Sequence, residues 1–364
     1  MEVFEFEAPP ILYWNSNVYA LQFSPDGTRL AVGSGGWYGG GGITVVDVRA
    51  QKSSTLRFGD CKKTDQVAAP WTSHKLTISG VCFDGSGRHL VLSSWSSSQR
   101  AAPTFVCEVD GLELSHVATL ETTTEPRIWR RCPTGVGLLD GQVVVRCNAR
   151  RVEDVLLIHP APAGVDTDAP HAAHAHARMA IVNSRIITGG GGSLKLGGWS
   201  AVEGNYESHK AAEGLLVFPD PIQAKATNAR VTAVLATADG GLITGGLDGA
   251  LNHWSLQENG WTVDRILREA KPRKSKLNTS WATYRPESII GLCRLDSDRW
   301  FSVDAGGQIC GWTNNSCTDH FDLHRTGTPR TIAVHPQTPI GPLLAVGVKG
   351  DEDERRGFVA CFKV

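Results

Sequence analysis

Three histidines lie close together in one short segment of the chain. His171, His174 and His176 fall within six residues. Three imidazoles at this spacing could ligate zinc or copper if the segment folded around one ion. A closed zinc site needs four ligands, however, and the preceding residues 160–170, rich in alanine and proline, are typical of a connector. The three histidines are therefore candidate ligands only, and we expect no metal and no other cofactor.

The densest run of positive charge is followed by an aromatic residue. The run contains Lys271, Arg273, Lys274 and Lys276, and Trp281 comes shortly after it. Basic side chains can neutralise phosphates and aromatic rings can stack on bases, so this segment could bind nucleic acid. A basic run in a long loop can equally be an ordinary solvated surface.

Two further segments, rich in glycine or serine, carry residue types that bind partners. Trp37 and Tyr38 follow paired glycines, and Trp95 and Arg100 flank a run of serines. Tryptophan, tyrosine and arginine dominate protein-binding hot spots. Trp37 could alternatively pack against a neighbouring part of the fold. Residues 351–356 add acidic and basic charge, a mixture that suits a protein partner better than nucleic acid.

Sequence signatures of hydrolases are absent. The chain has no Gly-x-Ser-x-Gly elbow, no His-Glu-x-x-His pair, no phosphate-binding loop and no Ser-x-Asp-x-Gly-x-x-Trp box. We therefore expect a protein that is not an enzyme. A hydrolase built from loop residues, or a metal-binding protein, remains an alternative because such sites can be assembled from scattered positions.

The elements that must position these segments form a repeat. An apolar strand, a turn and a second apolar strand occupy residues 18–33, then 78–93, then 231–246. An internal period of about forty to fifty residues built from short strands is typical of a β-propeller. Such a ring grows by adding blades around one axis, so a single domain of 364 residues is reasonable.

Two stretches of the repeat resemble a known family. Residues 243–255 read Ile-Thr-Gly-Gly-Leu-Asp-Gly-Ala-Leu-Asn-His-Trp-Ser, and residues 301–313 read Phe-Ser-Val-Asp-Ala-Gly-Gly-Gln-Ile-Cys-Gly-Trp-Thr. This phrasing resembles the WD40 repeat family, which has roughly Ser-Gly-Ser-x-Asp-Gly-x-Ile-x-x-Trp-Asp at this place. The resemblance covers essentially the whole chain at the level of the repeat.

The WD40 resemblance implies a fold class, a number of blades and a way of closing the ring. It implies an all-β chain that forms one closed propeller over residues 1–364, with seven four-stranded blades; six and eight blades remain alternatives. We expect a strand at residues 3–7 to complete the last blade, residues 330–364, because that blade otherwise has only three strands. Closure of the ring also removes an exposed sheet edge.

The chain departs from the family pattern at its tryptophans. Trp199, Trp254 and Trp312 are followed by serine or threonine instead of aspartate. We therefore expect the network of His, Ser and Trp that ties blades together in this family to be mostly missing.

The stretch 127–158 lacks the usual turn residues between its apolar segments, and a loop rich in Ala, Pro and His separates it from residues 179–218. There we expect strands at residues 127–132, 135–139, 143–147, 155–158, 179–182, 186–188, 194–199 and 215–218.

Composition indicates a compartment and excludes a broad class of partner. A formal net charge of -1 argues against non-specific binding to nucleic acid over the whole surface. The nine cysteines form no Cys-x-x-Cys pair, and most fall in apolar strands, which indicates a reducing compartment. The acidic N-terminal residues 1–7 lack the features of a signal peptide, and no segment is apolar enough to span a membrane. We expect an intracellular, cytoplasmic protein.

These observations lead to one expected function and one alternative. In WD40-like propellers the loops inside a blade after its second strand share a face, the top face, with the loops between blades. The resemblance therefore places the aromatic and basic residues named in the preceding paragraphs on one face of the ring. We expect a non-catalytic protein–protein interaction scaffold, a subunit of a larger complex that binds other proteins through these loops. The alternative is a nucleic-acid-associated subunit that uses residues 271–276.

Overall fold

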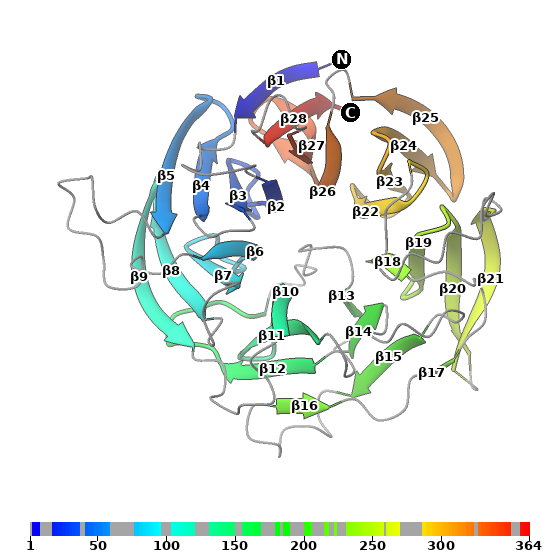
Figure 1. Cartoon of the computed structure of the whole chain (residues 1–364), viewed down its shortest axis with the longest axis horizontal. Helices are drawn as coiled ribbons and strands as arrows, with labels where there is room; N and C mark the ends of the chain where they lie inside the picture. The colour runs from blue at the N-terminus through cyan, green and yellow to red at the C-terminus, as the bar shows by residue number, and fades with distance from the viewer. Residues whose placement is uncertain are drawn as a thin grey trace.

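The computed structural model describes most of the chain as strands arranged in a ring (Figure 1). The described residues are 2–7, 17–36, 41–58, 76–95, 103–120, 131–149, 155–168, 179–182, 185–189, 200–205, 215–217, 222–223, 231–257, 260–269, 286–323, 327–350 and 357–364. Every regular element in these ranges is a β-strand. In the same ranges there is no helix with the length and hydropathy needed to cross a membrane.

Five sheets contain four antiparallel strands each. Three of them have strands that are consecutive in the chain: β6 (Thr77–Phe83), β7 (His89–Trp95), β8 (Thr104–Asp110) and β9 (Glu113–Leu120); β18 (Val231–Ala236), β19 (Leu242–Gly246), β20 (Leu251–Gln257) and β21 (Gly260–Arg268); β22 (Ile289–Arg294), β23 (Arg299–Asp304), β24 (Gln308–Thr313) and β25 (Ser316–Asp322). These are the repeating units expected from the sequence.

In the two sheets in the middle of the chain, the outer strand of the first sheet follows the third strand of the second sheet in sequence. Their members are β10 (Arg131–Leu139), β11 (Gln142–Ala149), β12 (Val155–Pro160) and β16 (Leu215–Val217) in one sheet, and β13 (Met179–Val182), β14 (Arg185–Gly189), β15 (Ser200–Asn205) and β17 (Ile222–Gln223) in the other. The strands expected at 143–147, 155–158, 179–182, 186–188 and 215–218 correspond to β11, β12, β13, β14 and β16. A single strand, β10, runs through residues 131–139, where a break at 133–134 was expected. The strand expected at 194–199 lies outside the described residues, and the third strand of the second sheet is β15 at 200–205.

The remaining eight strands form one sheet that contains both ends of the chain. They are β1 (Glu2–Glu7), β2 (Asn17–Phe23), β3 (Arg29–Gly35), β4 (Gly41–Asp47), β5 (Lys52–Phe58), β26 (Thr328–Thr338), β27 (Gly341–Lys349) and β28 (Phe358–Lys363). A single pair, Asn17 with Lys349, joins β2 to β27. The strand expected at residues 3–7 is present as β1, which pairs antiparallel with β28 from Glu2 opposite Phe362 to Glu7 opposite Phe358.

Burial falls from the centre of the ring outward, as the residue types of the strands require. Every residue of the inner strand β6 is buried, whereas the outer strand β25 is exposed at nearly every position. Inner strands are apolar on both faces because each sheet is covered by a neighbouring sheet on either side. The core therefore consists of separate apolar layers between consecutive sheets.

Glycines allow these sheets to approach one another. A Cβ at Gly33 of β3 would lie 2.9 Å from the Ile78 side chain of the next sheet, and one at Gly347 of β27 would lie 2.5 Å from that of Val18. Gly245 of β19 faces Ile289 of β22 in the same way. The small residue in the second strand of a sheet thus accommodates a branched residue at the start of the next inner strand, which explains why the repeat carries glycine there.

Two tryptophans anchor strands within their own sheets. The Trp254 indole N–H donates to the Thr244 hydroxyl at 2.8 Å, and that of Trp312 donates to the Ser302 hydroxyl at 3.0 Å. The departures from the family pattern at these tryptophans predict that the network which includes such links is mostly missing. These links form although no aspartate follows either tryptophan, because they need only the indole and a hydroxyl on the neighbouring strand.

Candidate binding site

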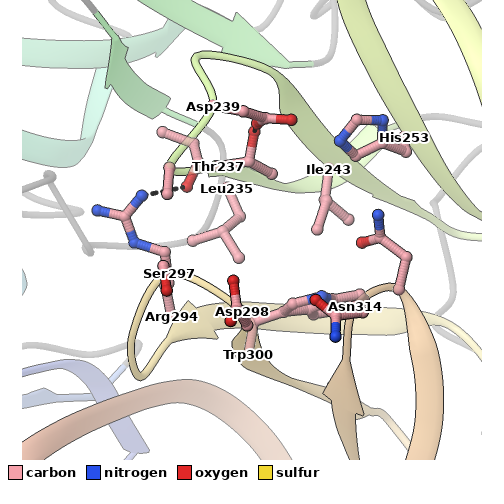
Figure 2. A pocket seen from close by; sticks show the side chains of 13 residues that line it. Leu235, Thr237, Asp239, Ile243, His253, Arg294, Ser297, Asp298, Trp300 and Asn314 are labelled. Carbon is pink, nitrogen blue, oxygen red and sulfur yellow. Dashed lines mark hydrogen bonds between the residues drawn. The ribbon is translucent and has the colours of Figure 1, made fainter.

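A pocket of about 220 Å³ lies between the β18–β21 sheet and the β22–β25 sheet (Figure 2). Its walls come from three turns, which connect β18 to β19, β22 to β23, and β24 to β25. Turn residues Thr237, Asp239, Ser297, Asp298 and Asn314 line it. Residues from two sheets therefore make the pocket, and neither sheet makes it alone.

The floor of the pocket is apolar and belongs to the core. Leu235, Ile243 and Trp300 lie in one buried cluster together with Trp312. The Trp300 and Trp312 rings stack with centroids 4.7 Å apart and planes at 3°. Stacked rings inside a packed core have little freedom to move, so the floor is held in place before any partner arrives.

Acidic groups occupy one side of the rim. The Asp239 carboxylate accepts hydrogen bonds from the Thr237 hydroxyl and from the Gly241 backbone N–H. The Thr237 hydrogen bond, helped by the backbone, outweighs the effect of partial burial and lowers the pKa of Asp239. This carboxylate is therefore ionised at neutral pH. Asp298, from the facing turn, is exposed at the rim.

Basic and imidazole groups stand at opposite sides of the same pocket, as Figure 2 shows for Arg294 and His253. The Arg294 guanidinium donates to the Ala236 carbonyl oxygen at 3.4 Å, and the arginine is otherwise exposed. His253 Nδ1 is 2.7 Å from the Asp264 carboxylate. The pocket thus combines an apolar floor with a rim that carries both signs of charge.

Among the described residues, His253 is not hydrogen-bonded to a side chain that it could activate as a nucleophile. Among the described residues, the one hydrogen-bonding partner of His253 is Asp264, so no serine, threonine or cysteine there shares a proton with this imidazole. The buried cysteines have no such role either, since burial raises the pKa of Cys82 and Cys107 to about 12. Thiols of this kind behave as small core residues.

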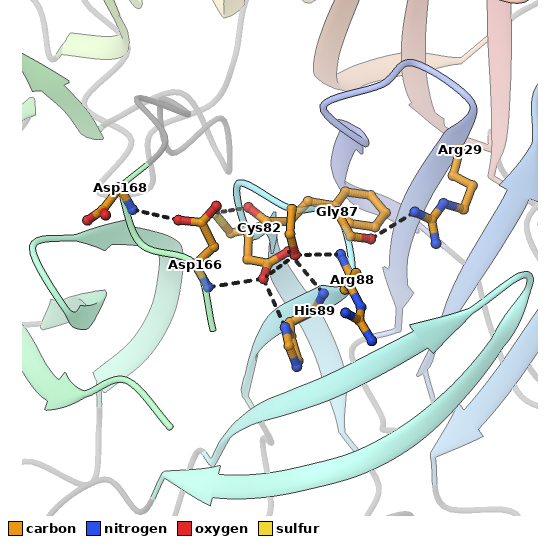
Figure 3. Close-up of polar contacts among 10 residues, drawn as sticks. Arg29, Cys82, Gly87, Arg88, His89, Asp166 and Asp168 are labelled. Carbon is orange, nitrogen blue, oxygen red and sulfur yellow. Dashed lines mark hydrogen bonds and ion pairs between the residues drawn. The ribbon is translucent and has the colours of Figure 1, made fainter. Parts of the chain in front are cut away.

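A second polar cluster ties the β6–β7 turn to residues 161–168 (Figure 3). The buried Asp84 carboxylate accepts from the His89 backbone N–H at 3.0 Å, from the His89 ring at 2.9 Å, and from the Asp166 N–H at 3.1 Å. Ser86 adds its hydroxyl at 2.9 Å. Burial by itself would raise the pKa of Asp84, but these hydrogen bonds outweigh it and lower the pKa. In the described part of the chain, every donor to the Asp84 carboxylate comes from the protein itself. We therefore infer that this cluster stabilises the fold.

The comparisons with known proteins identify the architecture. No family model and no curated protein matches the chain. Solved structures do match, and that of U3-55K, a WD40 β-propeller protein, aligns with a TM-score of 0.60 over 98% of both chains. The fold is that of a WD40-like β-propeller. With 12% sequence identity to U3-55K, and with 883 chains of solved structures matching, the likeness shows the fold alone.

The pocket opens on one face of the propeller, and the binding residues predicted from the sequence belong to the opposite, top face. Consecutive connections in an antiparallel sheet lie at alternate ends, so the β18–β19, β22–β23 and β24–β25 turns share one face. The segments with the predicted site residues follow the second strand of a sheet (β3 or β7) or its fourth strand (β21). Those strand ends lie on the other face of the ring.

Of the predicted binding residues, Trp95 lies in the described part of the chain. It is the last residue of β7 and is half-buried. The others lie outside the described residues and stay predictions: Trp37, Tyr38, Arg100, Lys271, Arg273, Lys274, Lys276 and Trp281. The same holds for the candidate metal ligands His171, His174 and His176.

The sequence did not predict the pocket, although the residues of its turns have recognisable turn types. Asp239-Gly240 and Asn314-Asn315 have the residue types that favour turns, and a turn was all they indicated. Their proximity depends on how two sheets pack together. No spacing within a single repeat contains that information.

Proposed function

We propose that this protein is a non-catalytic interaction platform and that the pocket between the β18–β21 and β22–β25 sheets receives one side chain of a protein partner. The observation that carries this proposal is the combination of a rigid apolar floor, formed by Leu235, Ile243 and Trp300, with a rim of both charges. An apolar anchor with polar neighbours fits such a site. Because the ring is closed and packed, binding needs no rearrangement, and the entropic cost is small.

The size of the pocket favours a side chain over a small molecule. Pockets for small ligands are typically about 300–1,000 Å³. The volume here is about 220 Å³, which accommodates one or two side chains. Asp239 and Asp298 on one side, with Arg294 on the other, would orient the polar groups that flank the anchor.

We also propose seven blades in a single domain over residues 1–364. The eight-stranded sheet is joined in its middle by one residue pair, Asn17 with Lys349, whereas strands within a blade pair over most of their length. Division at that point leaves β1 with β26–β28 as one blade and β2–β5 as another, and five four-stranded sheets remain. As the partners we propose other subunits of a cytoplasmic complex.

The test exchanges charge at the rim without touching the floor. Arg294 and Asp298 are exposed, so an R294E/D298K variant should fold normally. A matched control, R265E/D322K, exchanges the same charges at exposed outer-strand positions that do not line the pocket. A photo-crosslinking residue at position 297 identifies proteins that reach the pocket in the native cell.

The proposal expects specific crosslinked proteins, retained at high salt by the wild type and by R265E/D322K and lost by R294E/D298K. Equal retention by all three proteins would show that the pocket is not the binding site. Captured nucleic acid that dissociates as salt rises would instead favour the segment 271–276.

A further inference from the structure

A group of two cysteines and one histidine lies on the outer part of the β22–β25 sheet. Cys310 is in β24, and Cys317 and His320 are in β25. In the described part of the chain it is the one group of three or more cysteine, histidine or acidic residues whose ligand atoms all lie close enough to hold a metal ion. Each of the three atoms lies within 4.8 Å of the others.

A β-bulge brings these side chains to the same face of the sheet. Cys310 is paired with His320, and two positions along, Trp312 is paired with Cys317. The register shifts between these pairs, so Thr318 is an extra residue in β25. In a regular strand, residues three apart point to opposite faces, but one inserted residue restores the same side. Cys317 and His320 therefore both face the side that carries Cys310.

Each sulfur lies near a different nitrogen of the His320 ring, at a distance close to that between two donors of one zinc ion. Cys310 Sγ is 3.5 Å from Nδ1 of His320, and Cys317 Sγ is 3.4 Å from Nε2 of the same ring. Donor atoms around tetrahedral zinc are roughly 3.5–3.8 Å apart, given metal bonds of about 2.3 Å to sulfur and 2.0 Å to nitrogen. The imidazole must turn so that a single nitrogen faces the ion, and His320 is exposed, which leaves room for that rotation.

Packing accounts for the other described cysteines but not for Cys317. Cys82, Cys107, Cys293, Cys310 and Cys361 are buried, whereas Cys317 is exposed on an outer strand. An exposed thiol adds nothing to a core. Its position beside a second sulfur and an imidazole gives it a chemical environment that the core cysteines lack.

Charge at the site also suits a divalent cation. Two thiolates and one neutral imidazole around Zn²⁺ give a neutral complex, which the half-buried position of the group tolerates. The neighbouring Arg268 guanidinium is 3.7 Å from the Asp304 carboxylate, so its charge is offset by a partner of its own.

We propose that Cys310, Cys317 and His320 bind one Zn²⁺ ion, with solvent as the fourth ligand. The site lies on the same face of the β22–β25 sheet as Trp300 and Trp312, because Cys310 belongs to the same buried cluster as these two rings. It does not depend on the proposed binding function.

The experiment measures metal binding by the full-length reduced protein. Zn²⁺ is titrated against a chromogenic chelator, and Co²⁺ is used as a spectroscopic substitute, because thiolate ligation gives it a charge-transfer band that histidines alone do not. The variants C317S and H320A change exposed residues, so both should fold. H116A, an exposed histidine on the outer strand β9, is the matched control. A triple alanine variant at His171, His174 and His176 removes the other candidate ligands.

One equivalent of Zn²⁺ and a thiolate band in wild type, H116A and the triple variant are expected. C317S and H320A should each weaken binding by at least about 10-fold. Loss of binding in the triple variant, an affinity of C317S or H320A equal to that of the wild type, or no stoichiometric binding by the wild type would overturn the proposal. Formation of a Cys310–Cys317 disulfide in air, with no metal bound under reducing conditions, would overturn it as well.

Discussion

The Thr232 hydroxyl donates a hydrogen bond to the backbone carbonyl of Ile289 at 2.6 Å, so one side chain joins the inner strands of two neighbouring sheets. Thr232 is the extra residue of a bulge in β18, where the register shifts between Val231 and Ala233. The bulge turns the hydroxyl toward the next sheet, and Gly245 allows the Ile289 side chain to approach. Bulges at the corresponding position follow Val18, Ile78, Ile289 and Pro329.

Replacement of Thr232 by valine should destabilise the propeller. The substitution keeps the shape but leaves the buried Ile289 carbonyl without this donor, at a cost of about 2 kcal/mol. The urea midpoint measures the loss. Thr119→Val, at an exposed position of β9, is the control and should change the midpoint little. A midpoint for T232V equal to that of the control would contradict the role assigned to the hydroxyl.

Gly245→Ala should cost about 1–3 kcal/mol, because the new methyl group collides with the Ile289 side chain. The same alanine should cost less in a protein that already carries Ile289→Ala, since part of the obstructing side chain is gone. Urea unfolding of the four proteins in this double-mutant cycle measures the coupling. Additive effects would mean that Gly245 is not required for the approach of the sheets.

The stacked tryptophans should differ in their tolerance of phenylalanine. The Trp312 indole N–H is bonded to Ser302, whereas the buried Trp300 N–H has no hydrogen-bond partner among the described residues. Trp312→Phe should therefore destabilise more than Trp300→Phe, by about 1 kcal/mol.

Denaturant unfolding of both tryptophan variants checks this order, and Ser302→Ala should reproduce part of the loss seen for Trp312→Phe. Equal losses for the two tryptophans would show that ring packing alone sets their contribution.

Asp84 should make stability depend on pH. Its folded pKa is lowered, so its contribution is fully present above the unfolded pKa of about 3.9 and is lost as the pH falls through the folded value. Asp84→Asn should reduce the unfolding free energy by about 2 kcal/mol at pH 7, and the difference from wild type should shrink below about pH 4. Unfolding curves over a pH series measure this difference. Asp322→Asn, at an exposed site, is the control; a D84N difference that stays constant with pH would contradict the assignment.

The sequence predicted the strands best where turn residues separate apolar stretches. The pattern at residues 18–33 corresponds to β2 and β3, and that at 301–313 to β23 and β24. It was wrong at residues 133–134, where a break between two strands was expected and one strand, β10, continues through 131–139. The strand expected at 194–199 lies outside the described residues. Pro133 and Gly135 are residue types that favour turns, but in the structure they flank a β-bulge inside one strand. The pairing of β12 with β16 in particular depends on segments far apart in the chain.

The sequence by itself determined the all-β repeat and the WD40-like architecture, because alternating apolar strands and turns are local patterns that most of the repeats carry. Tertiary structure alone decided the pocket, the enclosure of Asp84 and the meeting of Cys310 with Cys317 and His320. Each of these depends on which sheets pack together or on one inserted residue in a strand. Packing and register are properties of pairs of strands, so a reading of one strand at a time cannot contain them.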